Sequence, residues 1–75
     1  MVNDMIMTNS HRIRIACTYV NISEAELARR LGTTPAAFNR RMKRNAFDEK
    51  DLEKICETLG AKYISQIKFP DGTQF

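Results

Sequence analysis

Apolar residues recur at the i, i+3, i+4, i+7 spacing of an amphipathic helix in two segments of the chain. They are Ile13, Ala16, Cys17 and Val20 in the first segment, and Leu52, Ile55, Cys56 and Leu59 in the second. The first pattern predicts a helix that is capped by Asn9 or Ser10 and ends at Asn21, a residue type that tolerates the left-handed conformation. The second pattern predicts a helix with Asp48 as its N-cap and Gly60 as its end.

Two shorter helices are predicted between these segments, from their start and stop signals. Ser23 and Glu26 stand in the S-x-x-E relation of a capping box, and Gly32 predicts the end of that helix. Thr34 and Pro35 then match an N-cap followed by a proline at the first helical position. Two helices joined by a short turn form a helix-turn-helix layout.

The predicted helix at 35–44 has two chemically different sides. At about 100° per residue, Phe38 and Met42 share one side, which suits a core. The residues that project from the opposite side are Ala36, Asn39, Arg40 and Lys43. We therefore expect this helix to pack through its aromatic side and to present its polar side outward.

After Gly60 the residue types change from helix formers to β formers. The stretch 63–69 predicts a strand, Pro70-Asp71-Gly72 predicts a turn, and residues 73–75 can begin a return strand. A short hairpin is marginal by itself in water, and an open strand edge invites pairing. Two interpretations stay open: the segment packs on the helices of its own chain, or it pairs with a second chain.

Seventy-five residues are enough for one small domain. We expect a partly flexible N-terminal segment at 1–9, a helical domain at 10–60 and a C-terminal β segment at 61–75. No apolar run approaches the roughly 20 residues of a membrane span. The first ten residues lack the basic and apolar regions of a secretory signal, so we expect a cytoplasmic protein without membrane contact.

The chain offers few residues for metal binding or catalysis. Cys17, Cys56 and the single His11 form no ligand cluster by spacing, so no metal is expected. Both cysteines fall on apolar helix faces, which predicts buried thiols, although one disulfide between them stays open. No nucleophile–base pair is present, and so small a core leaves little room for a deep pocket. We expect no enzymatic activity, no cofactor and no small-molecule ligand.

Positive charge is concentrated in one part of the sequence. Between Leu27 and Phe47 there are six basic residues and no acid, whereas the rest of the chain carries six bases and nine acids. The six are Arg29, Arg30, Arg40, Arg41, Lys43 and Arg44. Such a block attracts a polyanion through steering and counterion release, although a solvated helix face explains the charge equally well.

Together, the stretch Ser23-x-x-Glu-Leu-Ala-x-x-Leu-Gly-Thr-Thr34, Phe38 and the basic residues 40–44 resemble the Cro/repressor (XRE) helix-turn-helix family. The similarity covers roughly residues 10–60. It implies a mainly α, lambda-repressor-like domain of four to five helices with a short C-terminal β-strand or hairpin. It also implies that residues 35–44 enter the DNA major groove, which admits one helix.

The resemblance assigns roles residue by residue. Pro35, Ala36 and Arg40 match the family's base-reading positions, and Thr33 and Thr34 lie where hydroxyls and backbone N–H groups meet phosphates. The remaining positions near the phosphates are Asn39, Lys43, Arg44 and Asn45.

Three residues depart from the family pattern. Glu24 replaces a frequent glutamine that contacts phosphate, so its carboxylate needs pairing, for which an arginine would serve. Arg41 stands at a position that is usually apolar, which leaves the core role to Met42. Pro35 and Ala36 offer no hydrogen-bonding side chain, so direct readout depends mainly on Arg40 and on DNA shape.

We therefore expect a sequence-specific, repressor-like DNA-binding regulator that binds a palindromic operator in double-stranded DNA as a homodimer. The candidate dimerisation residues are Tyr63, Ile64, Ile67 and Phe69. The alternative is a protein-interaction module of antitoxin or adaptor type that keeps the fold and uses the C-terminal strand.

Overall fold

The fold comes from a computed structural model that describes residues 8–64 and 67–75. The elements in this part of the chain are α1 (Asn9–Val20), α2 (Glu24–Arg30), α3 (Pro35–Arg44), α4 (Glu49–Thr58), β1 (Lys62–Tyr63) and β2 (Ile67–Lys68). The expected class, a mainly α domain with a short C-terminal hairpin, is confirmed. The segment 1–9 is expected to be partly flexible, but its residues 1–7 lie outside the described part of the chain.

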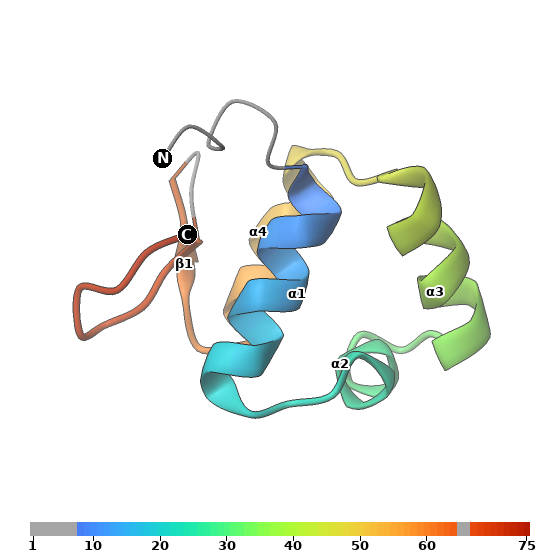
Figure 1. The fold of residues 1–75 in the computed structure, drawn as a ribbon, viewed down its shortest axis with the longest axis horizontal. Coiled ribbons are helices and arrows are strands. Elements are labelled where there is room, and N and C mark those ends of the chain that lie inside the picture. Colours follow the sequence, from blue (N-terminus) through green and yellow to red (C-terminus); the bar gives the residue numbers. More distant parts are fainter. Residues whose placement is uncertain (1–7, 65–66) are drawn as a thin grey trace.

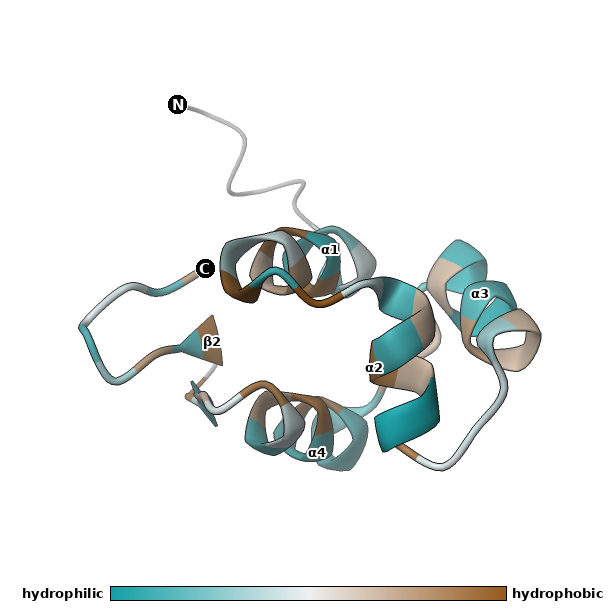
Figure 2. Cartoon of the chain, turned by 90° about the horizontal axis from the view of Figure 1, so that it is seen from below, coloured by the Kyte–Doolittle hydropathy of each residue, from teal (hydrophilic) through white to brown (hydrophobic). Residues whose placement is uncertain are grey.

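The helices form the middle and one end of the molecule, and the β segment forms the other end. Figures 1 and 2 show α1 and α4 in the middle, α2 and α3 at one end, and the chain after α4 at the opposite end. One apolar core joins them, and every helix contributes to it. Its fully buried large residues are Phe38, Ile13, Leu27, Ile55, Ile67 and Cys56.

The first helix begins one residue earlier than the sequence pattern predicts. Its N-cap is Thr8, whose hydroxyl accepts a hydrogen bond from the His11 N–H at 3.1 Å, so the prediction of Asn9 or Ser10 was wrong. Ser10 is instead buried and bonds to another helix. The predicted end is confirmed, because Asn21 adopts the left-handed conformation at φ 59°.

The two helices of the helix-turn-helix layout begin at the predicted caps. The Ser23 hydroxyl accepts from the Glu26 N–H at 3.0 Å, and the Thr34 hydroxyl accepts from the Ala37 N–H at 3.1 Å. Gly32 takes φ +82° just after α2, which a residue with a Cβ would adopt only with strain. Leu27 and Ala28 on α2 are fully buried, so α2 packs on the core through these two residues.

The predicted continuous strand at 63–69 is wrong in its length. The chain folds back within it, so that Tyr63 pairs with Ile67 in an antiparallel β1–β2 arrangement. The C-terminal residues pair on the other side of β2: the Ile67 N–H donates to the Phe75 carbonyl at 2.9 Å, and the Phe75 N–H donates back at 2.8 Å. Because the chain folds back, β2 has backbone partners within the chain on both sides, β1 on one side and Phe75 on the other. The Ile67 side chain is buried at the same time. One long strand would leave these backbone groups without partners in the chain.

An aromatic cluster attaches this β segment to α1. The ring centroids of Tyr19 and Phe69 lie 4.8 Å apart, and those of Tyr19 and Phe75 lie 5.6 Å apart. The Tyr19 hydroxyl donates a hydrogen bond to the Asp71 carboxylate, and this bond is the main reason that the pKa of Asp71 is lowered. The tail therefore packs on the helices of its own chain, as one of the two interpretations expects, and pairing with a second chain stays a prediction.

Both cysteines are buried free thiols, as the apolar spacing predicts. Burial is the main reason that the pKa of each thiol rises to about 11. Neither thiol is therefore a reactive nucleophile at neutral pH.

Candidate nucleic-acid interface

Helix α3 lies at the outer edge of the molecule (Figure 1), and the polar residues of one of its sides are exposed. Its core side consists of Phe38 and Met42, which are 1% and 3% exposed, so the predicted core role of Met42 is confirmed. The residues of the opposite side, Ala36, Asn39, Arg40 and Lys43, are all exposed. The apolar anchors thus hold the helix, while its solvent side stays free of contacts with the core.

The candidate DNA-contacting residues form a continuous stretch of chain on and around α3. All of them are exposed except Thr33, which is half-buried and whose N–H donates to the Ala28 carbonyl at 3.0 Å. The exposed ones are Thr34, Pro35, Ala36, Asn39, Arg40, Lys43, Arg44 and Asn45. The fold therefore brings the predicted residues to one end of the molecule. The Thr33 N–H already has a partner within the chain and is not free to donate to a phosphate.

The six basic residues between Leu27 and Phe47 divide into two groups by their partners. Arg29 and Arg30 on α2 both pair with Glu26, at 3.2 and 3.0 Å, and the hydrogen bond from Arg30 is the main reason that the pKa of Glu26 is lowered. Arg41 pairs with Asp51. Within residues 8–64 and 67–75, the ones without an ion-pair partner are Arg40, Lys43 and Arg44. Glu26 offsets only one of the two charges on α2, so most of the unneutralised charge of the block, that of Arg40, Lys43 and Arg44, lies on α3.

A shallow hollow of about 370 Å³ lies between the N-terminal parts of α2 and α3. The residues that line it are Glu24, Ala25, Pro35, Ala36, Phe38 and Asn39. Most of these side chains carry no hydrogen-bonding group, so the hollow suits an apolar group better than a polar one.

Glu24, at the rim of this hollow, has the arginine partner that its sequence position requires. The Arg14 Nε on α1 donates to the Glu24 carboxylate at 3.2 Å. The sequence predicts an arginine partner for Glu24 but does not identify it, because Arg14 lies ten residues away on another helix. The positive charge of Arg14 offsets the negative charge of Glu24 at this rim.

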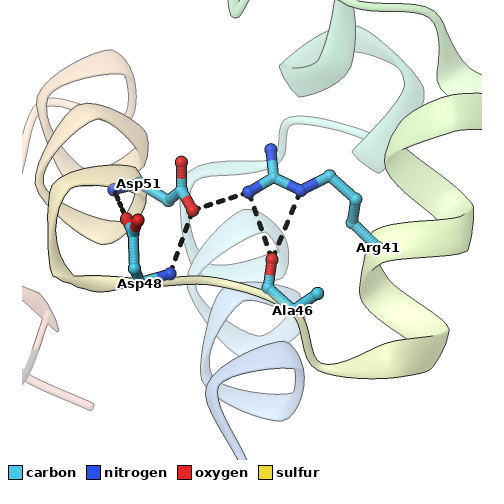
Figure 3. Close-up of polar contacts among 4 residues, drawn as sticks. All are labelled: Arg41, Ala46, Asp48 and Asp51. Atoms are coloured by element: carbon cyan, nitrogen blue, oxygen red, sulfur yellow. Dashed lines mark hydrogen bonds and ion pairs between the residues drawn. The ribbon is translucent and has the colours of Figure 1, made fainter.

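Arg41 connects α3 to the start of α4 (Figure 3). Its Nη2 donates to the Asp51 carboxylate at 2.6 Å and to the Ala46 carbonyl at 3.1 Å, and its guanidinium carbon lies 4.9 Å from the centre of the Phe47 ring. Asp51 also accepts from the Asp48 N–H at 2.9 Å, which completes a capping box. Asp51 is therefore a structural contact between α3 and the start of α4.

Asp51 makes the stability of this connection dependent on pH. The hydrogen bond from the Asp48 N–H, followed by the charge of Arg41, lowers the pKa of Asp51. A carboxyl group whose pKa is lowered by folding stabilises the fold above its unfolded pKa of about 3.9, and this contribution is lost as the pH falls through the folded value.

We expect Asp51→Asn to lower the free energy of unfolding by about 1 kcal/mol between pH 5 and 8, the upper range for a partly exposed ion pair. Urea titrations at several pH values should show the difference from wild type narrowing below about pH 4. Glu53→Gln removes one negative charge from the same helix and is the matched control. A difference that persists undiminished at pH 2 would contradict this account.

Asn45 ends α3 and also contacts α1. It adopts the left-handed conformation at φ 53°, and its Oδ1 accepts from the Ser10 N–H at 2.9 Å. The Ser10 hydroxyl donates to the Met42 carbonyl at 2.6 Å. Asn45 thus fixes the end of α3 with its oxygen, and its predicted phosphate contact stays a prediction. Sequence reasoning missed Ser10, because only the packing of α1 brings it to this site.

The predicted dimerisation residues do not share one environment. Ile67 and Phe69 are 1% and 5% exposed, because their side chains lie in the core of their own chain. Tyr63 is half-buried, and only Ile64 is well exposed, at 56%. The reason is the fold-back of the tail, which uses these apolar side chains to cover α1 and α4.

The described part of the chain contains no group of three or more His, Cys, Asp or Glu residues that could hold a metal ion. No helix in the same part is long and apolar enough to cross a membrane. Comparisons with protein-family models, curated proteins and solved structures found no match to this chain.

Proposed function

We propose that this chain is a sequence-specific DNA-binding transcriptional regulator of repressor type that inserts α3 into the major groove. The observation that carries the proposal is the outward side of α3, where Arg40, Lys43 and Arg44 are exposed and unpaired among the described residues. The bases elsewhere in the block are held by acids. Free cations on one exposed helix side suit a polyanion that follows a groove.

In this proposal Pro35, Ala36 and Arg40 on α3 read the bases. Arg40 donates two hydrogen bonds to guanine O6 and N7, the commonest specific contact in the major groove. Ala36 and Pro35, beside the hollow between α2 and α3, receive the methyl group of a thymine. Lys43 and Arg44 lie toward the other end of the helix and contact phosphates, which set position rather than sequence.

We further propose that two copies bind a palindromic operator, because one helix reads only a few base pairs. The tail is a poor interface for this pairing, since it lies at the end of the molecule away from α3 and the longest extent is 32 Å. Pairing through the tails would place the two α3 helices on the order of 60 Å apart, nearer two helical turns than one. Half-sites one turn apart therefore require pairing through another face.

Selection from random duplex pools tests the proposal directly. We expect the purified chain to enrich a palindrome whose half-sites contain guanine and thymine and lie about one helical turn apart. The slope of log affinity against log salt concentration should be about −4 or steeper if each of two copies places Lys43 and Arg44 on phosphates. Binding that does not depend on salt, or no enrichment from any pool, would refute the proposal.

A further inference from the structure

Two lysines of the β segment face each other across the β1–β2 pair. Lys62 and Lys68 are direct partners in the antiparallel register, and both side chains are exposed. Like charges that lie directly opposite each other in a sheet destabilise it. Within the described residues, neither lysine has an ion-pair partner that would relieve the repulsion.

The same lysines line the rim of an open hollow of about 440 Å³. Its other side chains are mostly apolar and include Ile64, Phe69 and Pro70. Ile64 is 56% exposed, more than any other large hydrophobic residue in the described part of the chain. Tyr19, the next most exposed, already has polar partners in Asp71 and Thr73, whereas the aliphatic side chain of Ile64 has no such reason to be at the surface.

We propose that this hollow binds an acidic peptide segment of a protein partner, in which carboxylates flank an aliphatic side chain. The carboxylates meet Lys62 and Lys68 and remove their mutual repulsion, while the aliphatic side chain covers Ile64 and Pro70. An exposed apolar group at a cationic rim suits a peptide better than a duplex, whose outer surface presents phosphates and sugars.

The hollow lies far enough from α3 that a bound peptide leaves this helix accessible. The β segment lies at the end of the molecule away from α3, so a partner bound there leaves the exposed side of α3 free (Figures 1 and 2). The chain can then hold DNA at one end and an acidic protein segment at the other. The inference rests on the β segment alone and does not depend on whether α3 binds DNA.

Fluorescence anisotropy with a defined probe tests the inference. The probe is a fluorescein-labelled peptide with Glu-Leu-Glu-Leu-Glu between Gly-Ser ends, and the matched controls replace Glu by Lys or Leu by Ser. We expect saturable binding of the acidic, leucine-containing peptide that weakens roughly tenfold in the Lys62→Ala/Lys68→Ala variant. Ile64→Ser should weaken it several-fold, and Arg40→Ala, at the other end, should leave it unchanged.

A charge reversal separates a binding role from a purely structural one. Lys68→Glu places opposite charges across the strand pair, so we expect its melting temperature to rise by a few degrees while peptide binding is lost. Equal binding of all three peptides, or no binding of any, would overturn the inference. Binding of a random duplex, weakened by Lys62→Ala/Lys68→Ala and not matched by the peptide, would also overturn it and assign the surface to nucleic acid.

Discussion

Phe38→Ala is expected to leave most of the chain unfolded at 25 °C. Truncating a buried phenylalanine to alanine costs about 3–5 kcal/mol, and a core of this size supplies on the order of 3–5 kcal/mol in total. Phe38 is 1% exposed, and its ring centroid lies 5.8 Å from that of Phe47, just before α4. It is also one of the two residues that hold α3 on the core, so its loss removes the support of the candidate interface.

Far-UV circular dichroism and urea unfolding measure this effect. Phe75→Ala is the matched control, because Phe75 is only half-buried and packs at the edge of the aromatic cluster with Tyr19 and Phe69. We expect the Phe75 variant to unfold cooperatively at a lower urea concentration than wild type, and the Phe38 variant to show little or no folded baseline. A Phe38 variant that loses less than about 1 kcal/mol would contradict the assigned core.

Arg40→Ala and Lys43→Ala are expected to weaken DNA binding in two different ways. If Arg40 pairs with a guanine, its loss costs about 1–3 kcal/mol on the selected operator and much less on unrelated DNA, so discrimination falls. If Lys43 contacts a phosphate, its loss weakens binding to every duplex alike and reduces the salt slope by about one for each copy bound. Both side chains are exposed, so neither substitution removes a core contact.

Titrations of each variant against the selected operator and a scrambled duplex, at several salt concentrations, measure both effects. Lys68→Ala is the control for the loss of a positive charge, because it lies at the end of the molecule away from α3. Equal losses on both duplexes for Arg40→Ala would remove it from base reading. A Lys68→Ala loss as large as that of Lys43→Ala would mean that the charge of the whole chain, rather than α3, governs binding.

Local signals in the sequence account for the helices. Ser23, Thr34 and Asp48 cap the helices that their positions predict, because a capping hydrogen bond spans only three residues and depends on nothing distant. The apolar spacing likewise identified the buried sides of α1, α3 and α4, including Phe38, Met42 and both cysteines. The cap at Thr8 escaped prediction because the amphipathic pattern begins later than the helix does.

The contacts of the candidate site were predictable only in part. The need of Glu24 for an arginine is a matter of charge, which the sequence displays, but the choice of Arg14 depends on how α1 crosses α2. The sequence shows that Arg41 replaces the apolar residue usual at this position of the family. Its bond to Asp51 is not predictable, because it requires the loop at Ala46 to turn α4 back toward α3. The fold-back between β1 and β2 was missed because β propensity does not distinguish one long strand from two short ones.

The sequence by itself determined the order of the helices, the N-caps of α2, α3 and α4, the buried sides of α1, α3 and α4, and the concentration of basic residues around α3, because these properties arise between residues a few positions apart. Only the tertiary structure decided that Arg41 pairs with Asp51, that the tail covers its own core, and that Lys62 faces Lys68. These outcomes depend on groups distant in the sequence meeting in space. Burial of apolar surface brings them together, and it acts on total area rather than on any local pattern.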